Sequence, residues 1–222
     1  MHTIRFSLGV LRSAALSILL LSQVAPVARA QFNFGVNGGF AGSVTTEALA
    51  GYSSTKLDSG GALGGAVGYR FGNGLTLGMS VDQFRMTLRE NAENFGSLRM
   101  RPVIASVGWQ GRPSGRGLTG HAQIGGGVLL TNFQKGPFIT DLERTSRAQV
   151  VTTTKNAPAV ALGGGLDYFL HPKFSVFTDV RILFANVTTE WAAVGNIRVP
   201  LDFDKFYASN AQMLGGIRVW FK

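Results

Sequence analysis

The chain ends with the ten residues MLGGIRVWFK, at positions 213–222, whose side chains alternate between two faces. The odd-numbered positions form an apolar stripe that ends at the penultimate Phe221, whereas Arg218 falls on the opposite face. A period of two is the pattern of a β-strand, and an apolar stripe with this ending is typical of the last strand of a transmembrane β-barrel. These ten residues therefore predict a protein that crosses a membrane with strands.

The opposite end of the chain, residues 1–30, has the three parts of a cleavable secretory signal. Two arginines precede an apolar stretch at 13–21, and Ala28 and Ala30 supply the small residues that a signal peptidase requires. The apolar stretch is too short for a membrane-spanning helix, which needs about 20 apolar residues. We expect cleavage after Ala30, which would leave a mature chain of residues 31–222 that forms a single domain.

The composition of the mature chain excludes several classes of site. The signal holds three of the 21 basic residues and no acid, which leaves 18 basic against 12 acidic residues and a net charge of +6. The sequence contains no cysteine, which excludes a lipid-anchoring cysteine, disulfides and thiolate sites. A positive charge can indicate nucleic-acid binding. Here the basic residues are dispersed and the signal exports the chain, so we expect no nucleic-acid partner.

Alternating segments and two kinds of connection organise the mature chain. Short connections at 72–74, 111–117 and 171–173 contain Gly, Asn or Pro, the residues of tight turns. Longer polar connections lie between them, as in outer-membrane barrels, which have short periplasmic turns and long external loops. This rhythm predicts an all-β fold, a single eight-stranded antiparallel up-and-down transmembrane β-barrel. The expected strands are 32–44, 61–71, 75–84, 98–110, 118–130, 158–170, 174–187 and 206–221, and the expected long loops are 45–60, 85–97, 131–157 and 186–205.

A soluble β-sandwich is the alternative fold, because its strands also alternate. The outer face of a sandwich carries many charges, whereas the non-apolar face here is mostly Gly, Ala, Ser and Asn. Small side chains suit a narrow lumen, where residues meet across a small circle. Aromatic residues also gather near the short-turn ends of the segments, as in the interfacial girdle of a barrel. The expected girdle comprises Phe32, Phe34, Tyr69, Phe71, Trp109, Tyr168, Phe174 and Phe221.

The mature chain resembles the small outer-membrane barrels of Gram-negative bacteria, the broad family that includes the OmpA, OmpX and OmpW types. The resemblance rests on the terminal IRVWF at 217–221, on GGGLDYFL at 163–170 before a short turn, and on FSVFTDVR at 174–181. It implies a location in the bacterial outer membrane and insertion by the barrel-assembly machinery. Ile217, Val219 and Phe221 are the implied assembly signal, and Lys222 departs from the family pattern because it follows the terminal aromatic residue.

Charged residues on the lumen face are the best residue-level indication of function. Because an unpaired charge in a low-dielectric interior is costly, we expect them to form a network that closes the lower lumen. Counting along the strands places Asp82 about 20 Å from the other members, at ~3.4 Å per residue. Asp179 and Arg218 are expected to be diagonal neighbours on adjacent strands. The expected network comprises Arg70, Asp82, Asp167, Asp179, Arg181 and Arg218.

Catalytic and cofactor motifs are sparse. The mature chain has two histidines: His171 is expected in a short turn, and His121 in the lumen, where Asp167 could orient it only if the strands bring the two together. A nucleophile needs a base within hydrogen-bond reach and a third group to orient that base, and no such set is evident. The glycine triplets lack the Lys-Ser/Thr of a phosphate-binding loop, and no residue spacing suggests a metal site. We therefore expect no catalytic activity, no cofactor and no metal.

Three functions are compatible with this pattern. We expect a non-catalytic outer-membrane barrel with a structural or surface-interaction role and a largely plugged lumen. The first alternative is a passive channel for small or hydrophobic molecules, similar to the OmpW type. A lipid-modifying enzyme is the second, and it would need a histidine site near the outer leaflet, where neither His121 nor His171 is expected.

The expected partners are membrane lipid, with lipopolysaccharide as a further candidate, and the barrel-assembly machinery; a monomer is favoured over an oligomer. The loop at 131–157 carries Arg144 and Arg147, which could contact anionic lipopolysaccharide. A solvated loop without such contacts is an equal alternative.

Overall fold

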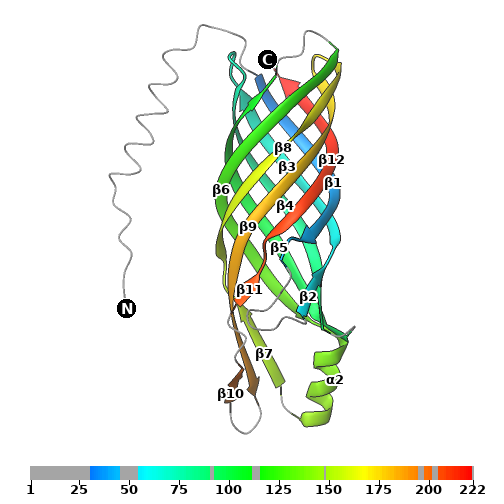
Figure 1. Ribbon diagram of the computed structural model, residues 1–222, viewed down its shortest axis with the longest axis vertical. Helices are drawn as coiled ribbons and strands as arrows, with labels where there is room; N and C mark the ends of the chain where they lie inside the picture. The colour runs from blue at the N-terminus through cyan, green and yellow to red at the C-terminus, as the bar shows by residue number, and fades with distance from the viewer. Residues whose placement is uncertain are drawn as a thin grey trace, which may run out of the picture.

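The computed structural model describes residues 31–45, 55–90, 93–111, 116–147, 149–194, 198–201 and 205–221. The strands form one tall barrel with the C-terminus at one end (Figure 1). The predicted signal peptide, with Ala28 and Ala30, lies outside the described residues, as does Lys222, so cleavage after Ala30 stays a prediction.

Eight long strands form the barrel wall, and each pairs antiparallel with its two neighbours. The last strand pairs with the first, with Phe32 opposite Phe221, so the sheet has no free edge over this stretch. The predicted closed eight-stranded antiparallel barrel is therefore confirmed. The wall strands are β1 (Gln31–Ser43), β3 (Gly60–Arg70), β4 (Leu75–Glu90), β5 (Glu93–Gln110), β6 (Gly117–Lys135), β8 (Ala157–His171), β9 (Phe174–Val194) and β12 (Asn210–Phe221).

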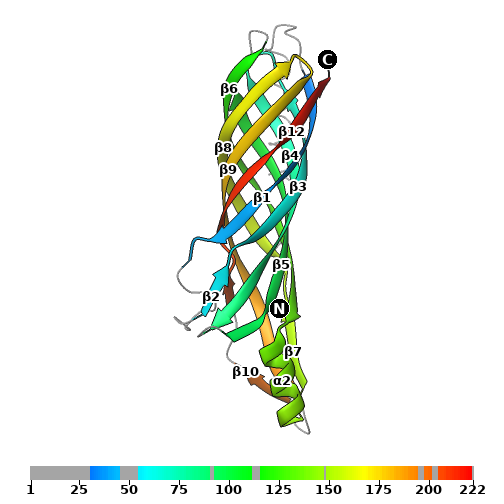
Figure 2. The ribbon, with the colours of Figure 1, turned by 90° about the vertical axis from the view of Figure 1, so that its right-hand side faces the viewer.

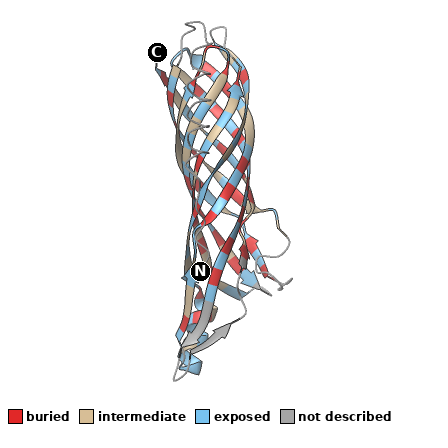
Figure 3. Ribbon diagram, turned by 90° about the vertical axis from the view of Figure 1, so that its left-hand side faces the viewer, coloured by how far each residue is buried: buried red, intermediate tan, exposed pale blue. Residues whose placement is uncertain are grey.

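Burial alternates along the wall strands, as the two-residue period predicts (Figure 3). On β9, Val180 and Phe184 are exposed on the outer surface, whereas Asp179, Arg181 and Leu183 are buried inside. Exposed apolar side chains in a continuous outer band indicate a lipid-facing surface, because a protein in water would bury them.

We call the end of the barrel with the short connections the turn end. It has the tight turns that the sequence predicts. The N–H of Gly74 donates to the carbonyl of Phe71 at 3.0 Å, and the Asn73 side chain accepts from the N–H of Leu75 at 3.0 Å. Gly74 has φ +94°, a conformation that side chains disfavour, so glycine is required there. The expected aromatic girdle is present: its members Phe32 and Phe221 lie 6.2 Å apart between ring centroids.

The opposite end, the loop end, differs from the prediction because the strands run further. The segment 85–97 was expected to be a long loop, but β4 continues to Glu90 and β5 begins at Glu93. Likewise, β9 has 21 residues, about twice the length that crosses a bilayer. The outer face becomes polar beyond the apolar band, so the apolar stripe ends before the strand does and does not indicate its full length. Additional short strands at the loop end are β2 (Thr55–Asp58), β7 (Gln149–Thr154), β10 (Arg198–Leu201) and β11 (Lys205–Tyr207).

Helix α2 (Pro137–Ser146) was also absent from the all-β prediction. It extends beyond the barrel beside β7 (Figure 2). Buried Ile139 joins the apolar core, and the Phe138 ring lies 4.5 Å from the Phe95 ring between centroids. The Glu143 carboxylate accepts from Lys135 Nζ and from the N–H of Val150, both at 2.6 Å, so it connects the helix to β6 and β7. The described residues include no helix that is long and apolar enough to span a membrane, which has no bearing on crossing by strands.

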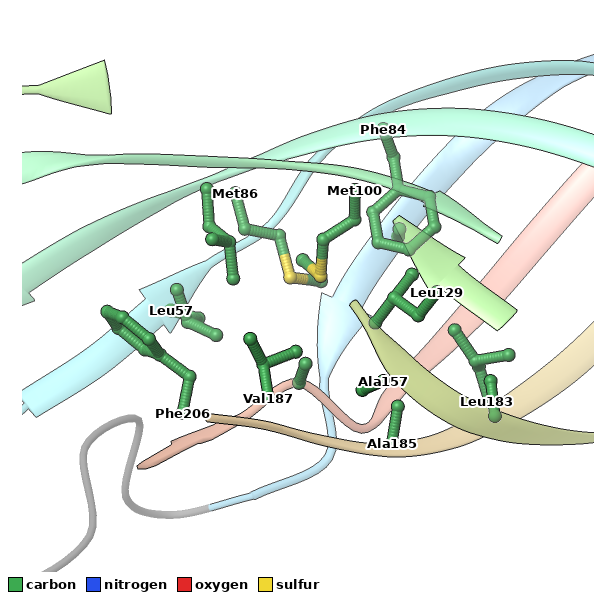
Figure 4. Packing of buried hydrophobic residues seen from close by; sticks show 14 of the residues in the cluster. Leu57, Phe84, Met86, Met100, Leu129, Ala157, Leu183, Ala185, Val187 and Phe206 are labelled. Carbon is green, nitrogen blue, oxygen red and sulfur yellow. The ribbon is translucent and has the colours of Figure 1, made fainter. Parts of the chain in front are cut away.

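The lumen was expected to be lined mostly by small residues, and this was wrong for its loop-end half. Large apolar side chains fill that half. Met86, Met100 and Leu129 meet across the interior with Phe84 and Leu183 (Figure 4). The expected third and fourth strands, 75–84 and 98–110, do not include the inward Met86 and Leu88. The barrel interior thus has a polar half at the turn end and an apolar half at the loop end.

Placing a charge on the apolar band tests the membrane-facing assignment. Val180→Arg should lower the free energy of unfolding by about 2–4 kcal/mol, because Val180 lies near the middle of the band. Asn186→Arg, on the same face of β9 beyond the band, should cost ~0–1 kcal/mol. Urea titration of both variants refolded in vesicles measures the difference, and equal costs would show that the band does not face lipid.

The Glu143 bridge should make helix α2 sensitive to acid. The hydrogen bond from Lys135 holds the pKa of Glu143 below its ordinary value of 4.5. A depressed pKa means that the bridge stabilises the folded form above pH 4.5 and is lost as the pH falls through the lower folded value. Hydrogen exchange of α2, corrected for intrinsic rates, should therefore rise in acid. Glu143→Gln should raise it already at neutral pH, and Asp141→Asn, on the exposed face, should not.

Candidate functional site

The polar half of the lumen contains a connected set of buried ionisable side chains, which we call the lumen charge chain. It consists of Asp82, Arg181, Asp179, His121, Asp167 and Arg218, contributed by β4, β9, β6, β8 and β12. The two-residue period points all six side chains inward, and the narrow barrel brings them within contact distance.

Arg181 forms the first half of the chain, because it bridges two carboxylates. Its Nη1 lies 2.5 Å from Asp82 Oδ2, and its Nη2 lies 3.2 Å from Asp179 Oδ2. Nη1 also contacts Ser80 Oγ at 3.3 Å, and the Asn37 side chain donates to Asp82 at 3.2 Å. These contacts join β1, β4 and β9 across the interior.

His121 connects the two halves of the chain. Its Nδ1 lies 2.8 Å from Asp167 Oδ2, and its Nε2 lies 3.6 Å from Asp179 Oδ1. The chain contains three carboxylates and two guanidiniums, so a protonated His121 would bring it to neutrality. The sequence analysis made contact between His121 and Asp167 conditional on strand placement, and the structure meets that condition.

Arg218 closes the chain at the other side of the lumen. Its Nη1 lies 2.6 and 2.8 Å from the two oxygens of Asp167, and its guanidinium stacks 4.4 Å from the centroid of the Phe177 ring. Asp167 is fully buried and also accepts from Ser175 at 3.2 Å and from Gln110 at 2.9 Å. Four side chains from four different strands therefore surround one carboxylate with donors and positive charge, the arrangement that a buried charge requires.

Two details of the predicted network were wrong. Asp82 is not remote, because strand tilt carries it to Arg181. Asp179 and Arg218 are not diagonal neighbours: Asp179 lies opposite Leu214 in the β9–β12 register, and Arg218 lies opposite Ser175.

Arg70, the remaining predicted member, lies at the turn end. Its Nη1 donates to the carbonyl of Gly111 at 3.1 Å, its Nη2 donates to the Gln31 side chain, and its guanidinium lies 4.8 Å from the centroid of the Trp220 ring.

Neutral lumen residues that the sequence analysis did not assign complete the site. Gln123 donates to Asp179 at 3.3 Å and accepts from Ser106, and Gln110 donates to Asp167. The sequence could have indicated these residues by their position on the lumen face, because an amide inside a narrow barrel must form hydrogen bonds there. Trp220, which the alternation placed inward, donates from Nε1 to Ser175 at 3.1 Å and so orients the hydroxyl that supports Asp167.

The cavities next to the lumen charge chain are small. A cavity of about 70 Å³ is lined by Asn37, Ser80, Gln123 and Arg218 among others, and a second, of about 10 Å³, lies next to Arg181. The first holds a few water molecules, since one water occupies about 30 Å³ of liquid. Neither cavity is large enough for a solute the size of a sugar or a fatty acid.

The geometry around His121 favours an ionic role. Both ring nitrogens face carboxylates, whereas a general base must leave one nitrogen free for the proton of a nucleophile. Among the residues that the structure describes, no cluster of three or more His, Asp or Glu side chains could hold a metal ion. The lumen charge chain can therefore hold the strands together and exclude free charge from the lumen.

Comparison with known proteins identifies the family. Residues 13–210 match the family described as outer membrane protein beta-barrel domain. The chain belongs to this family. The match ends where β12 begins, and the structure supplies this last strand of the barrel. No curated protein sequence matches the chain.

Solved structures of outer-membrane proteins share the fold at low identity. The outer membrane protein OprG from Pseudomonas aeruginosa is 14% identical and superposes with a TM-score of 0.62, covering 87% of this chain and 98% of its own. Neisserial surface protein A is 12% identical, with a TM-score of 0.53 over 86% and 97% of the two chains. The outer membrane protein AlkL is 17% identical, with a TM-score of 0.52 over 89% and 93%.

The family places the protein in the bacterial outer membrane. In such barrels the short turns face the periplasm and the long loops face outward. The polar half of the lumen, with the charge chain, therefore lies toward the periplasm. The apolar half and helix α2 lie toward the exterior.

The Asp167–Arg218 pair should stabilise the barrel strongly. Arg218→Met leaves Asp167 buried without its closest cation and should cost about 3–5 kcal/mol of unfolding free energy. Asp167→Asn in the same chain should recover most of that loss, since both charges are then absent. The exposed pair Arg89–Asp58 is the control, and Arg89→Met should cost less than about 1 kcal/mol. Urea unfolding of the three variants measures these values, and equal losses for Arg218→Met and Arg89→Met would contradict the network.

Proposed function

We propose that the protein is a non-catalytic, non-conducting outer-membrane barrel that holds a structured surface element outside the cell. The observation that supports this most directly is the closure of the lumen by two successive layers. The lumen charge chain crosses the periplasmic half, and Phe84, Met100 and Leu129, each at most 1% exposed, pack in the outer half. A solute would have to break ion pairs and displace packed side chains in sequence.

The assembly at the loop end supports the surface role. β5, β6 and β9 extend well beyond the length that a bilayer requires. Helix α2 packs on β5 through Phe138, and the Glu143 bridge connects it to β6 and β7. Ordered structure of this kind beyond the membrane is an available contact surface for other molecules. Because an eight-stranded interior is just wide enough to be filled by side chains, a filled lumen is consistent with a supporting role.

A passive conduit for apolar molecules is the second candidate, and one observation favours it. The outer half of the lumen is lined by apolar side chains that include Met86 and Met100, whose unbranched side chains can repack around a guest. This route would need a rearrangement, because the described side chains fill that half in the present conformation.

Single-channel recording in planar bilayers should separate the two candidates. The refolded parent barrel should be electrically silent, whereas a variant that removes both layers, Asp82→Ala/Arg181→Ala/Phe84→Ala/Met100→Ala, should show discrete conductance steps. A matched variant with four alanines on the outer face, at Val160, Leu162, Val180 and Ile182, should stay silent. Reproducible steps from the parent, or uptake of an apolar dye by parent-containing vesicles above that of empty vesicles, would favour the conduit.

A further inference from the structure

We propose that the outer wall of the barrel carries a binding site for the phosphate groups of lipopolysaccharide, formed by Arg85, Arg99 and Arg101. We call these three residues the outer arginine cluster. They lie on β4 and β5, and their side chains point away from the lumen. This proposal is independent of whether the lumen conducts.

The cluster lies at the height where lipid headgroups are expected. Val81, Val103 and Val128 form one cross-strand row of the outer apolar band, on β4, β5 and β6. Arg101 lies two residues from Val103 toward the loop end, and Arg85 and Arg99 are two positions further from the band on their strands. The guanidiniums therefore begin where the apolar band ends, on the side of the outer leaflet.

The charges of the cluster lack acidic partners within the barrel. Arg85 and Arg99 lie directly opposite each other in the β4–β5 register, and like charges in this position are destabilising. Two of the three arginines donate to side-chain amides: Arg85 to Gln134, and Arg101 Nε to Gln83 at 2.7 Å. In the part of the chain that the structure describes, no carboxylate forms an ion pair with any of the three. An external anion would relieve this repulsion.

A hollow on the outer wall provides room for such an anion. It has a volume of about 240 Å³ and is lined by Arg99, Arg101, Leu130, Thr131 and Asn132. Two cations and the amide of Asn132 therefore share the hollow with one exposed apolar side chain, Leu130. This combination suits a phosphate that is attached to a hydrocarbon chain.

The chemistry favours lipopolysaccharide over other phosphates. A guanidinium presents parallel N–H donors that match a phosphate in two contacts. Three neighbouring guanidiniums fit a headgroup with more than one phosphate, as the lipid A part of lipopolysaccharide has. The adjacent apolar band accommodates its acyl chains. A soluble phosphate would gain nothing from that band, and a phospholipid such as phosphatidylglycerol offers a single phosphate.

The cluster also differs from the loop arginines as a candidate for this contact. Arg144 already pairs with Asp141 at 3.1 Å on helix α2, beyond the barrel wall. Arg144 and Arg147 therefore serve as a matched control, with the same residue type at a different height above the membrane.

Binding to purified lipid A by the refolded full-length mature barrel in zwitterionic nanodiscs tests the proposal. Arg85→Gln/Arg99→Gln/Arg101→Gln should bind lipid A at least about tenfold more weakly than the parent, because each lost charged hydrogen bond weakens binding. Arg144→Gln/Arg147→Gln should bind as the parent does. Enzymatically dephosphorylated lipid A should bind the parent at least about tenfold more weakly than lipid A does. This comparison uses only the parent protein, so it does not depend on whether the triple variant folds.

Each other outcome would overturn the proposal. Equal binding of lipid A by the parent and the folded triple variant would remove the cluster as the site. Equal binding of phosphorylated and dephosphorylated lipid A would show that acyl chains alone carry the affinity. If phosphatidylglycerol bound the parent as tightly as lipid A and showed the same loss in the triple variant, the site would take any lipid phosphate, and the assignment to lipopolysaccharide would be wrong.

Discussion

The narrow circumference of an eight-stranded barrel is the constraint on which the rest of the structure depends. Inward side chains from opposite walls meet in the middle, so each inward residue must find a partner from another strand. For Asp167, at 0% exposure, the partners come from β5, β6, β9 and β12. Pairing across the lumen offsets the desolvation penalty of the carboxylate and at the same time fills the space that a solute would need.

The interior solves this packing problem in two ways. In the periplasmic half, charges and amides pair in a chain from Asp82 to Arg218, and small cavities remain where polar groups can hold water. In the outer half, packing of Phe84, Met100 and Leu183 leaves no charge to satisfy. The outer wall has the inverse order, with an apolar band followed by the outer arginine cluster. The polarity of each surface therefore changes along the barrel axis, and the two surfaces change in opposite directions.

The sequence was sufficient to predict the fold because the alternation of apolar and small residues is a local property of each strand. It was sufficient to place Asp167 and Arg218 inside for the same reason. Which inward charges pair depends on register and tilt between strands, and these are not local. That is why Asp179 was expected next to Arg218, although it lies opposite Leu214, and why Asp82 was placed too far away. The strand extension to Glu90 was missed because its outer face, at Arg85 and Arg89, is exposed to a polar environment and the apolar stripe had ended.

The central claim is that a fixed ionic chain closes the periplasmic half of the lumen, and nuclear magnetic resonance of arginine side chains in the refolded barrel tests it most directly. Bonded guanidiniums rotate slowly about the Cζ–Nε bond. Arg181 and Arg218 should therefore show separate, slowly exchanging Nη signals at neutral pH, whereas exposed Arg144 should show one averaged signal. Averaged, rapidly exchanging signals from Arg181 and Arg218 would contradict the account, because the lumen would then hold mobile charges in water.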